Sequence, residues 1–100
     1  MKMLYITVNI SVLNQILEIL EKHSAKSYQV IERTWAKPLK GQKRFDDAVW
    51  PGYNAIIMLQ ADNALLKLVT LDLRQLNDTA HNDNELITWA DWELNSFTAE

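Results

Sequence analysis

The spacing of apolar residues switches between a two-residue and a helical period along this chain, and the order of these periods limits what it can fold into. Residues 3–8 alternate in the two-residue period of a strand. Residues 12–23 then carry leucine and isoleucine at helical spacing, with Ser11 before them as a candidate N-cap. Residues 28–35 return to the two-residue period. The first third of the chain therefore predicts a strand, a helix and a second strand.

The same kinds of period return after a polar interval. Residues 55–60 form a nearly continuous apolar run, as in a strand at the centre of a sheet. Residues 63–78 show helical spacing behind the candidate N-cap Asp62, and residues 86–92 alternate as a strand. The order strand, helix, strand, strand, helix, strand has few packing solutions. We therefore predict an α+β fold of the ferredoxin-like βαββαβ type, a four-stranded antiparallel sheet with two helices on one face.

The composition fits one domain that spans residues 1–100. Apolar residues make up 48% of the chain, enough for one continuous core at this length. The absence of cysteine excludes disulfides, thiolate metal sites and a cysteine nucleophile. No segment resembles a secretory leader or approaches the roughly 20 apolar residues of a membrane span, so we expect a cytoplasmic protein. The net charge of −3 argues against a nucleic-acid partner, whose binding relies on cations.

The face of the predicted sheet that lies away from the helices is expected to be apolar. In this interpretation Tyr5, Trp89 and the outward residues of 55–59 belong to that face. An apolar sheet face that no other element covers is an association site. The sequence therefore predicts that the chain oligomerises through its sheet.

Short segments across most of the chain resemble the PII-like family, the small trimeric signalling proteins related to nitrogen regulatory protein PII. They are the opening strand at residues 2–8, the stretch LEKHSAKSYQV at 20–30, and the turn Trp-Pro-Gly at 50–52 that leads into NAII at 54–57. The likeness extends to about Glu93. It implies a ferredoxin-like fold, a homotrimer assembled through the sheets, and the sensing of small molecules such as nucleotides in clefts between subunits.

The resemblance also assigns a role to the segment between the second and third strands. Residues 36–49 correspond to the family's T-loop, which contacts a protein partner, while residues 94–100 form a peripheral tail. The polar composition of 36–49 independently predicts an exposed loop or hairpin tip. The chain departs from nitrogen-regulatory PII proteins at 79–85, where a phosphate-binding loop rich in glycine and lysine is expected. This segment has neither residue, and its carboxylates oppose phosphate binding.

Cationic and aromatic residues in and around residues 36–49 are the candidate ligand-binding residues. Lysine and arginine can hold an anion, and a glycine lets the backbone approach it closely. Tryptophans that bracket the loop can meet at its base and stack on a nucleobase, or pack on each other or in a subunit interface. A solvated loop kept soluble by its charge is the alternative interpretation. The candidates are Arg33, Trp35, Lys40, Gly41, Lys43, Arg44 and Trp50.

The two histidines, His23 and His81, do not form a catalytic or metal-binding motif. His23 falls at the C-terminal end of the first predicted helix, where a cation is favoured, and His81 falls in a polar connection. Neither has the neighbours that a zinc site or a catalytic triad requires. We therefore predict no catalytic residue and no metal ligand.

The function most consistent with these features is that of a PII-like regulatory protein, without enzymatic chemistry. It would sense a small anionic effector, such as a nucleotide, and signal to a protein target through residues 36–49. One alternative is a dimeric α/β-barrel enzyme, such as a cofactor-independent monooxygenase, with Asn9, His81 and Trp89 around an apolar pocket. Another is a trimeric adaptor that has lost ligand binding. The identities of the effector and the partner stay open at this point.

Overall fold

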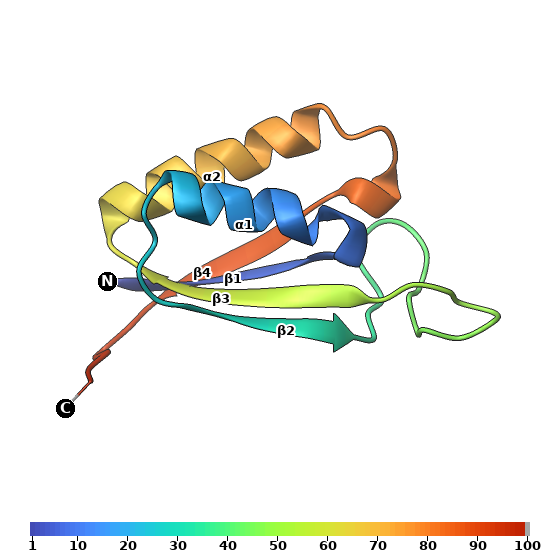
Figure 1. Ribbon diagram of the computed structural model, residues 1–100, viewed down its shortest axis with the longest axis horizontal. Coiled ribbons are helices and arrows are strands. Elements are labelled where there is room, and N and C mark those ends of the chain that lie inside the picture. Colours follow the sequence, from blue (N-terminus) through green and yellow to red (C-terminus); the bar gives the residue numbers. More distant parts are fainter. Residues whose placement is uncertain (100) are drawn as a thin grey trace.

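The computed structural model describes residues 1–99, which form a four-stranded antiparallel sheet with two helices on one of its faces (Figure 1). The strands lie in the order β2-β3-β1-β4, so the first and third strands of the chain are central. This arrangement confirms the predicted ferredoxin-like α+β fold. The elements are β1 (Lys2–Asn9), the 3₁₀ turn η1 (Ile10–Val12), α1 (Leu13–Lys22), β2 (Tyr28–Thr34), β3 (Asn54–Ala61), α2 (Asn63–Asp78), the 3₁₀ turn η2 (Asp83–Glu85) and β4 (Thr88–Glu93).

Pairing between β1 and β3 creates the core side of the sheet. Leu4 lies opposite Leu59 and Ile6 opposite Ile57, and all four side chains are fully buried. Alternate residues of both strands therefore face the helices. Each helix covers them with an apolar stripe at helical spacing. The fully buried residues of these stripes are Ile16 and Leu20 in α1 and Val69 and Leu73 in α2.

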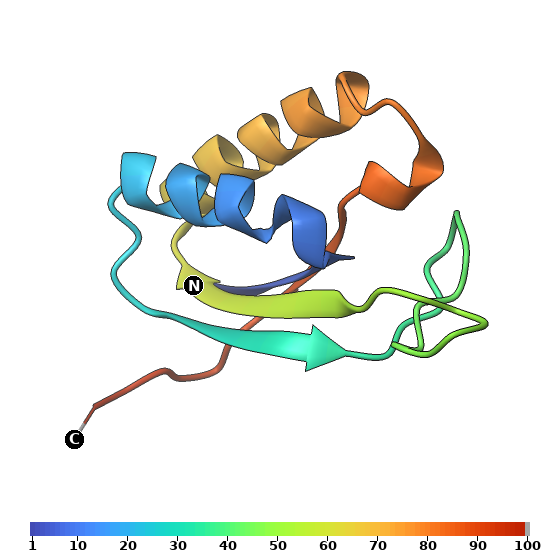
Figure 2. The same ribbon diagram turned by 45° about the vertical axis from the view of Figure 1, so that its right-hand side comes forward.

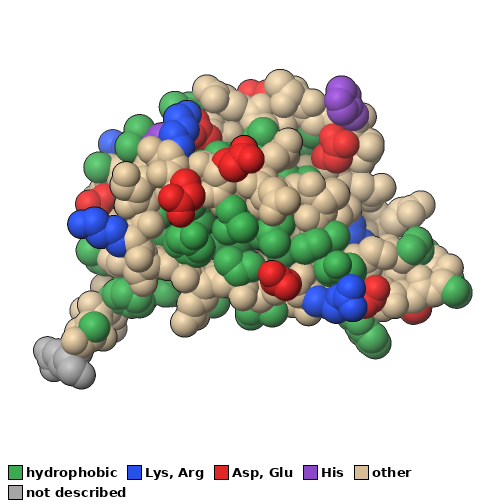
Figure 3. Space-filling view, in the orientation of Figure 1, with side chains coloured by type: hydrophobic (Ala, Val, Ile, Leu, Met, Phe, Trp, Pro, Cys, Tyr) green, Lys and Arg blue, Asp and Glu red, His purple; other side chains and the backbone are tan. Residues whose placement is uncertain are grey.

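The core is less well covered along the edge strand β2. The helix-side residues of this strand, Tyr28 and Val30, are half-buried, and so is Leu17 of α1. The space-filling view accordingly shows apolar side chains gathered between α1 and the strands below it (Figure 3). The tightest packing lies instead under both helices, over the central strands.

The two helices start in different ways, and within residues 1–99 neither is long and apolar enough to cross a membrane. At α2 the Asp62 carboxylate accepts a hydrogen bond from the Leu65 amide at 2.8 Å, which confirms the predicted N-cap. α1 follows the turn η1, where the Asn9 side chain accepts from the Ser11 amide at 3.1 Å. The prediction of Ser11 as the cap of α1 was wrong: Asn9 caps the preceding turn η1, and Val12, the residue before α1, makes no side-chain cap hydrogen bond.

The last strand begins at Thr88, two residues later than the alternation predicts. The Asn77 side chain, in the last turn of α2, donates to the Ile87 carbonyl at 2.9 Å and accepts from the Ile87 amide at 2.8 Å. Because the backbone of Ile87 is bonded to a side chain, ladder pairing with β1 begins at the next residue. Beyond β4 the chain extends away from the sheet as a tail (Figure 1), whose last residue, Glu100, lies outside the described residues.

The sheet face away from the helices is apolar and uncovered by any helix (Figure 2). Tyr5 lies there between Met58 of β3 and Ala90 of β4. The side chains of Ile31 and Trp92 on this face are 50% and 44% exposed. The prediction that placed Trp89 on this face was wrong: the alternation of β4 has the opposite parity, so that Trp89 lies opposite Ile6 on the helix side. There the guanidinium of Arg74 lies 5.8 Å from the centroid of its ring.

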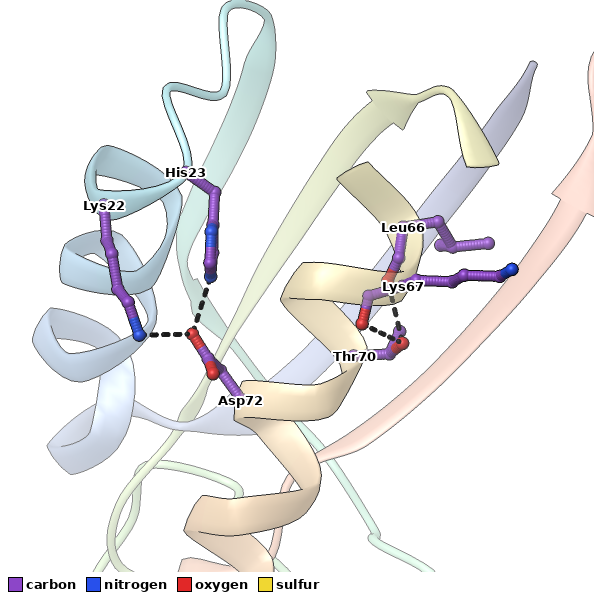
Figure 4. Close-up of polar contacts among 6 residues, drawn as sticks. All are labelled: Lys22, His23, Leu66, Lys67, Thr70 and Asp72. Atoms are coloured by element: carbon purple, nitrogen blue, oxygen red, sulfur yellow. Dashed lines mark hydrogen bonds and ion pairs between the residues drawn. The ribbon is translucent and has the colours of Figure 1, made fainter. Parts of the chain in front are cut away.

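A polar cluster ties the C-terminal end of α1 to the middle of α2 (Figure 4). The Asp72 carboxylate lies 2.7 Å from His23 Nε2 and accepts a hydrogen bond from the Lys22 ammonium at 3.2 Å. His23 and Asp72 are both largely buried, with side chains 12% and 14% exposed. The hydrogen bond from His23, and then that from Lys22, hold the pKa of Asp72 below its ordinary value.

We expect Leu73→Ala in α2 to lower the free energy of unfolding by about 2–5 kcal/mol, because the fully buried side chain leaves a cavity. Leu71→Ala in the same helix is the matched control, since Leu71 is 52% exposed, and we expect a change within about 0.5 kcal/mol. Urea unfolding followed by tryptophan fluorescence measures both. Equal losses in the two variants would contradict the orientation of α2 described above.

We expect the Asp72 cluster to make the fold sensitive to acid. A carboxyl group whose pKa is lowered by folding stabilises the protein above its unfolded pKa, about 3.9 for aspartate. That stabilisation is lost as the pH falls through the lowered value. Urea unfolding between neutral and acidic pH should therefore show a smaller acid dependence for Asp72→Asn than for the native chain. Asp78→Asn, at the exposed end of α2, controls for loss of an acid from this helix. The same acid dependence in the Asp72→Asn and native chains would contradict this account.

Candidate functional site

The segment between β2 and β3 protrudes beyond the end of the sheet and is internally structured (Figure 2). Backbone hydrogen bonds between Ala36 and Arg44, at 2.8 and 2.9 Å, close its first part into a small loop. Its second part is a turn in which the Asp47 carboxylate accepts from the amides of Val49 and Trp50, at 3.0 and 2.7 Å. The predicted loop 36–49 therefore consists of two tethered turns.

Arg44 lies at the centre of the loop base and is only 5% exposed. One of its guanidinium nitrogens donates to the Asn54 side-chain oxygen in β3 at 2.9 Å. The other donates to the backbone carbonyl and the side-chain oxygen of Asn84 in η2, at 3.0 and 3.3 Å. The Asn54 amide in turn donates to the Thr7 hydroxyl in β1 at 3.0 Å. This network connects the loop to two central strands and to the segment before β4.

The charge of Arg44 has no counter-charge beside it among residues 1–99: every hydrogen-bond partner of its guanidinium is a neutral amide. Burial lowers the pKa of Arg44 below its ordinary value. The guanidinium nevertheless stays protonated at neutral pH, because the ordinary pKa of arginine lies far above neutrality. The loop base therefore holds a buried positive charge that is hydrogen-bonded but not neutralised.

Gly41 allows the loop to approach η2 closely. Its backbone has a φ of +92°, in the left-handed region that glycine adopts without strain. A Cβ atom at this position would lie 2.7 Å from the side-chain oxygen of Asn84. That same oxygen accepts a hydrogen bond from the Gln42 amide at 3.3 Å. A side chain at Gly41 would therefore disturb the contact between the loop and Asn84.

The two tryptophans that bracket the loop do not form the pair proposed from the sequence. Trp35 is 72% exposed and packs against Phe45, with their ring centroids 5.7 Å apart. The Lys43 ammonium lies 5.4 Å from the centroid of the Trp50 ring and 5.9 Å from that of Phe45. Phe45 and Lys43 lie between the two tryptophans: Trp35 packs on Phe45, and the Lys43 ammonium lies over the rings of both Phe45 and Trp50. An aromatic and cationic surface results, with Trp35 open to solvent.

The remaining candidates lie at the edges of this site. The Arg33 guanidinium lies 4.2 Å from the centroid of the Tyr53 ring, and 3.5 Å from the Asp46 carboxylate. Arg33 is thus paired with a neighbouring carboxylate. Lys40 is exposed and lines a hollow of about 310 Å³ beside Trp89.

The structure thus places Gly41 and Arg44 against Asn84, and Lys43 against the rings of Phe45 and Trp50. Sequence reasoning missed two residues that hold this site together, Asn54 and Asn84. Asn54 follows the Trp-Pro-Gly turn, but nothing in the local pattern marks its side chain as a partner of Arg44. Asn84 lies 40 residues beyond Arg44 and was considered only as part of a segment that lacks glycine and lysine.

The three residues suggested for an enzyme pocket are dispersed. His81 lines a hollow of about 490 Å³ beside the start of α1 and the end of α2, together with Gln15 and Thr79. Trp89 lines the separate hollow beside Lys40. Asn9 is engaged in capping η1. This arrangement gives no support to a shared apolar pocket lined by Asn9, His81 and Trp89.

No family model matches this chain, and no curated protein sequence is significantly similar to it. Solved structures do match. A protein of Thermus thermophilus described as PII-like and signalling has a TM-score of 0.63 at 14% identity, over 91% of this chain and 83% of its own. CPII, a nitrogen regulatory PII-like protein of Thiomonas intermedia, matches in several ligand states.

The match to CPII bound to ADP and bicarbonate has a TM-score of 0.69 at 12% identity, and covers 95% of this chain and 88% of that one. The match to CPII bound to ADP, AMP and bicarbonate has a TM-score of 0.68 at 11% identity, with the same coverage. At these identities the likeness is one of fold. This chain has the fold of the PII-like signalling proteins.

Proposed function

We propose that this chain is a PII-like regulatory protein that binds a small anionic effector beside residues 36–49 and signals through that loop to a protein partner. The observation that carries the proposal is the buried guanidinium of Arg44 at the loop base, whose hydrogen-bond partners are neutral. A cation that is partly removed from water and lacks a counter-charge favours an anion beside it. The proposal involves binding and no catalytic step.

A further cation and an aromatic surface on the same loop suit a nucleotide-type effector. Lys43 is a second cation at the loop base, beside the ring of Trp50. The exposed ring of Trp35 offers a face on which a base could stack. CPII, which shares this fold, was solved with ADP and bicarbonate, and both of these ligands are anions. In this proposal the loop supplies the cations that the segment 79–85 lacks.

The effector would act by changing the conformation of the loop. Residues 36–49 are held by a small number of hydrogen bonds at their base, and exposed apolar side chains such as Leu39 and Val49 lie on them. A ligand that interacts differently with two arrangements of such a loop shifts the balance between them. The surface shown to a protein partner then depends on the effector.

The proposed assembly is a homotrimer formed through the helix-free face of the sheet. This face carries the exposed apolar side chains Ile31 and Trp92 and the half-buried ring of Tyr5. Covering them removes apolar surface from water, which favours association. The trimer is the assembly implied by the resemblance to PII-like proteins, and a cleft between subunits would place a second chain beside the loop base.

A trimeric adaptor without an effector is the second candidate function. Asp83 and Glu85 lie in the segment next to Arg44, and their charge opposes the binding of a phosphate there. The two candidates differ in one property, which is whether the native chain binds small anions at all.

We expect the native chain to have about three times the mass of one chain in light scattering. Ile31→Glu should reduce this mass, because a carboxylate at an apolar interface is costly to bury. Leu71→Glu is the matched control, since Leu71 is equally exposed but lies on α2, and it should keep the native mass. A dimeric mass would contradict the trimer and favour the enzyme alternative, and a monomeric mass would contradict both.

We expect ADP, AMP or sodium bicarbonate to change the intrinsic fluorescence of the native chain in a saturable way. Arg44→Lys should weaken the binding at least about tenfold, because lysine keeps the charge but loses the planar fork that grips oxyanions. Trp35→Phe and Trp50→Phe assign the signal to the loop base, and Lys26→Met, an exposed site outside the loop, is the charge control. If none of the three ligands binds to the native chain, the sensor proposal is wrong and the adaptor is favoured.

A further inference from the structure

Asn84 is the residue through which η2 holds the loop. Its backbone carbonyl and its side-chain oxygen both accept hydrogen bonds from Arg44, at 3.0 and 3.3 Å. The side-chain oxygen also accepts from the Gln42 amide at 3.3 Å, at the point where Gly41 leaves room for it. The first part of the loop accordingly rises toward η2 (Figure 2). One side-chain oxygen therefore accepts hydrogen bonds from Gln42 and Arg44, beside Gly41.

The two partners of the Arg44 guanidinium differ in how easily they can be replaced. Asn54 is 2% exposed, belongs to a central strand and is itself bonded to Thr7. Asn84 is exposed and belongs to a short 3₁₀ turn held by the Asn82 side chain, which accepts from the Asn84 amide at 2.9 Å. One side of the guanidinium is therefore held by a buried residue of a central strand. The other side is held by an exposed residue, which a ligand could displace more easily.

Asn84 presents neutral oxygens to a group that binds charged oxygens more strongly. A hydrogen bond from a guanidinium to a carboxylate or phosphate oxygen is about twice as strong as one to a neutral acceptor. An oxyanion that displaced the exposed Asn84 from the buried guanidinium of Arg44 would thus replace its contacts at a gain. It would not replace the contact of Gln42, which would lose its acceptor and be free to move.

We propose that Asn84 is a latch that holds residues 36–44 closed against η2 by occupying one side of the buried Arg44 guanidinium, and that an oxyanion opens the latch by taking its place. The inference concerns the same site as the proposed function, and its second half rests on that function. The first half, the latch itself, does not depend on any effector.

Amide hydrogen exchange of residues 36–44 in the ligand-free chain tests the latch. Asn84→Ala removes the side-chain oxygen that accepts from Arg44 and Gln42, but it keeps the backbone carbonyl that also accepts from Arg44. We expect exchange in this segment to become several-fold faster. Asn84→Asp keeps the accepting oxygen and adds a negative charge, so exchange should become slower than in the native chain. Gly41→Ala disturbs the same contact from the loop side and should resemble Asn84→Ala.

Asp83→Ala is the control in the same turn, since its side chain makes none of these contacts, and it should exchange as the native chain does. Unchanged exchange in both Asn84→Ala and Asn84→Asp would overturn the latch, whatever the protein binds. Faster exchange in Asp83→Ala, equal to that in Asn84→Ala, would also overturn it, because the effect would then come from the stability of η2.

Titration with sodium phosphate and sodium bicarbonate tests the oxyanion step. We expect Asn84→Ala to bind the anion several-fold more tightly than the native chain, because only the backbone carbonyl at this position has to be displaced, and Asn84→Asp to bind at least about tenfold more weakly. Equal affinities in the three chains would overturn the oxyanion step. Binding of ADP to all three chains with equal affinity would overturn it too, but would leave the proposed effector binding intact.

Discussion

The antiparallel pairing of β1 with β3 is the constraint on which the rest of the molecule depends. A one-residue slip of this register would move Leu4, Ile6 and their partners from the core to the open face, so both helices would lose their support. The same register determines where the site lies. It places Asn54, the first residue of β3, opposite Asn9, the last residue of β1. There the Asn54 side chain accepts a hydrogen bond from Arg44 and donates one to Thr7. The position of the buried guanidinium is therefore a consequence of the core.

The buried charge of Arg44 gives the site its chemistry. Its neutral partners compensate the loss of hydrogen bonds to water, but they do not cancel the charge. In the proposed function, these neutral hydrogen bonds hold the loop closed and leave the charge available to an anion. The helix tether at Asp72 shows the contrasting case, in which a carboxylate is paired directly with His23 and Lys22. The charge of Asp72 is thus paired within the fold, whereas that of Arg44 is not.

The sequence predicts the fold well because the elements have clear periods and clear ends. Asp62 begins α2 as expected, and the apolar run at 55–60 lies in the centre of the sheet. The errors arise where a local pattern has two equivalent solutions. Alternation shows that Trp89 and Trp92 lie on opposite faces of β4, but only pairing with β1 decides which of them faces the helices.

The candidate site is less predictable because its contacts join residues that are distant in the sequence. Arg44 is recognisable as one of several cations in a polar loop, yet its burial depends on Asn54 and Asn84, which other elements supply. The pairing of His23 with Asp72 escapes sequence reasoning for the same reason, since it forms only when the two helices lie side by side. The expected meeting of Trp35 and Trp50 fails because Phe45 and Lys43 come between them.

The most direct test of this account is a crystal structure of the protein grown with ADP and bicarbonate. The account predicts an oxyanion at about 2.7–2.9 Å from the guanidinium of Arg44, with Asn84 displaced and residues 36–44 moved away from η2. Arg44 still bonded to Asn84, with the ligand absent or bound elsewhere, would contradict it.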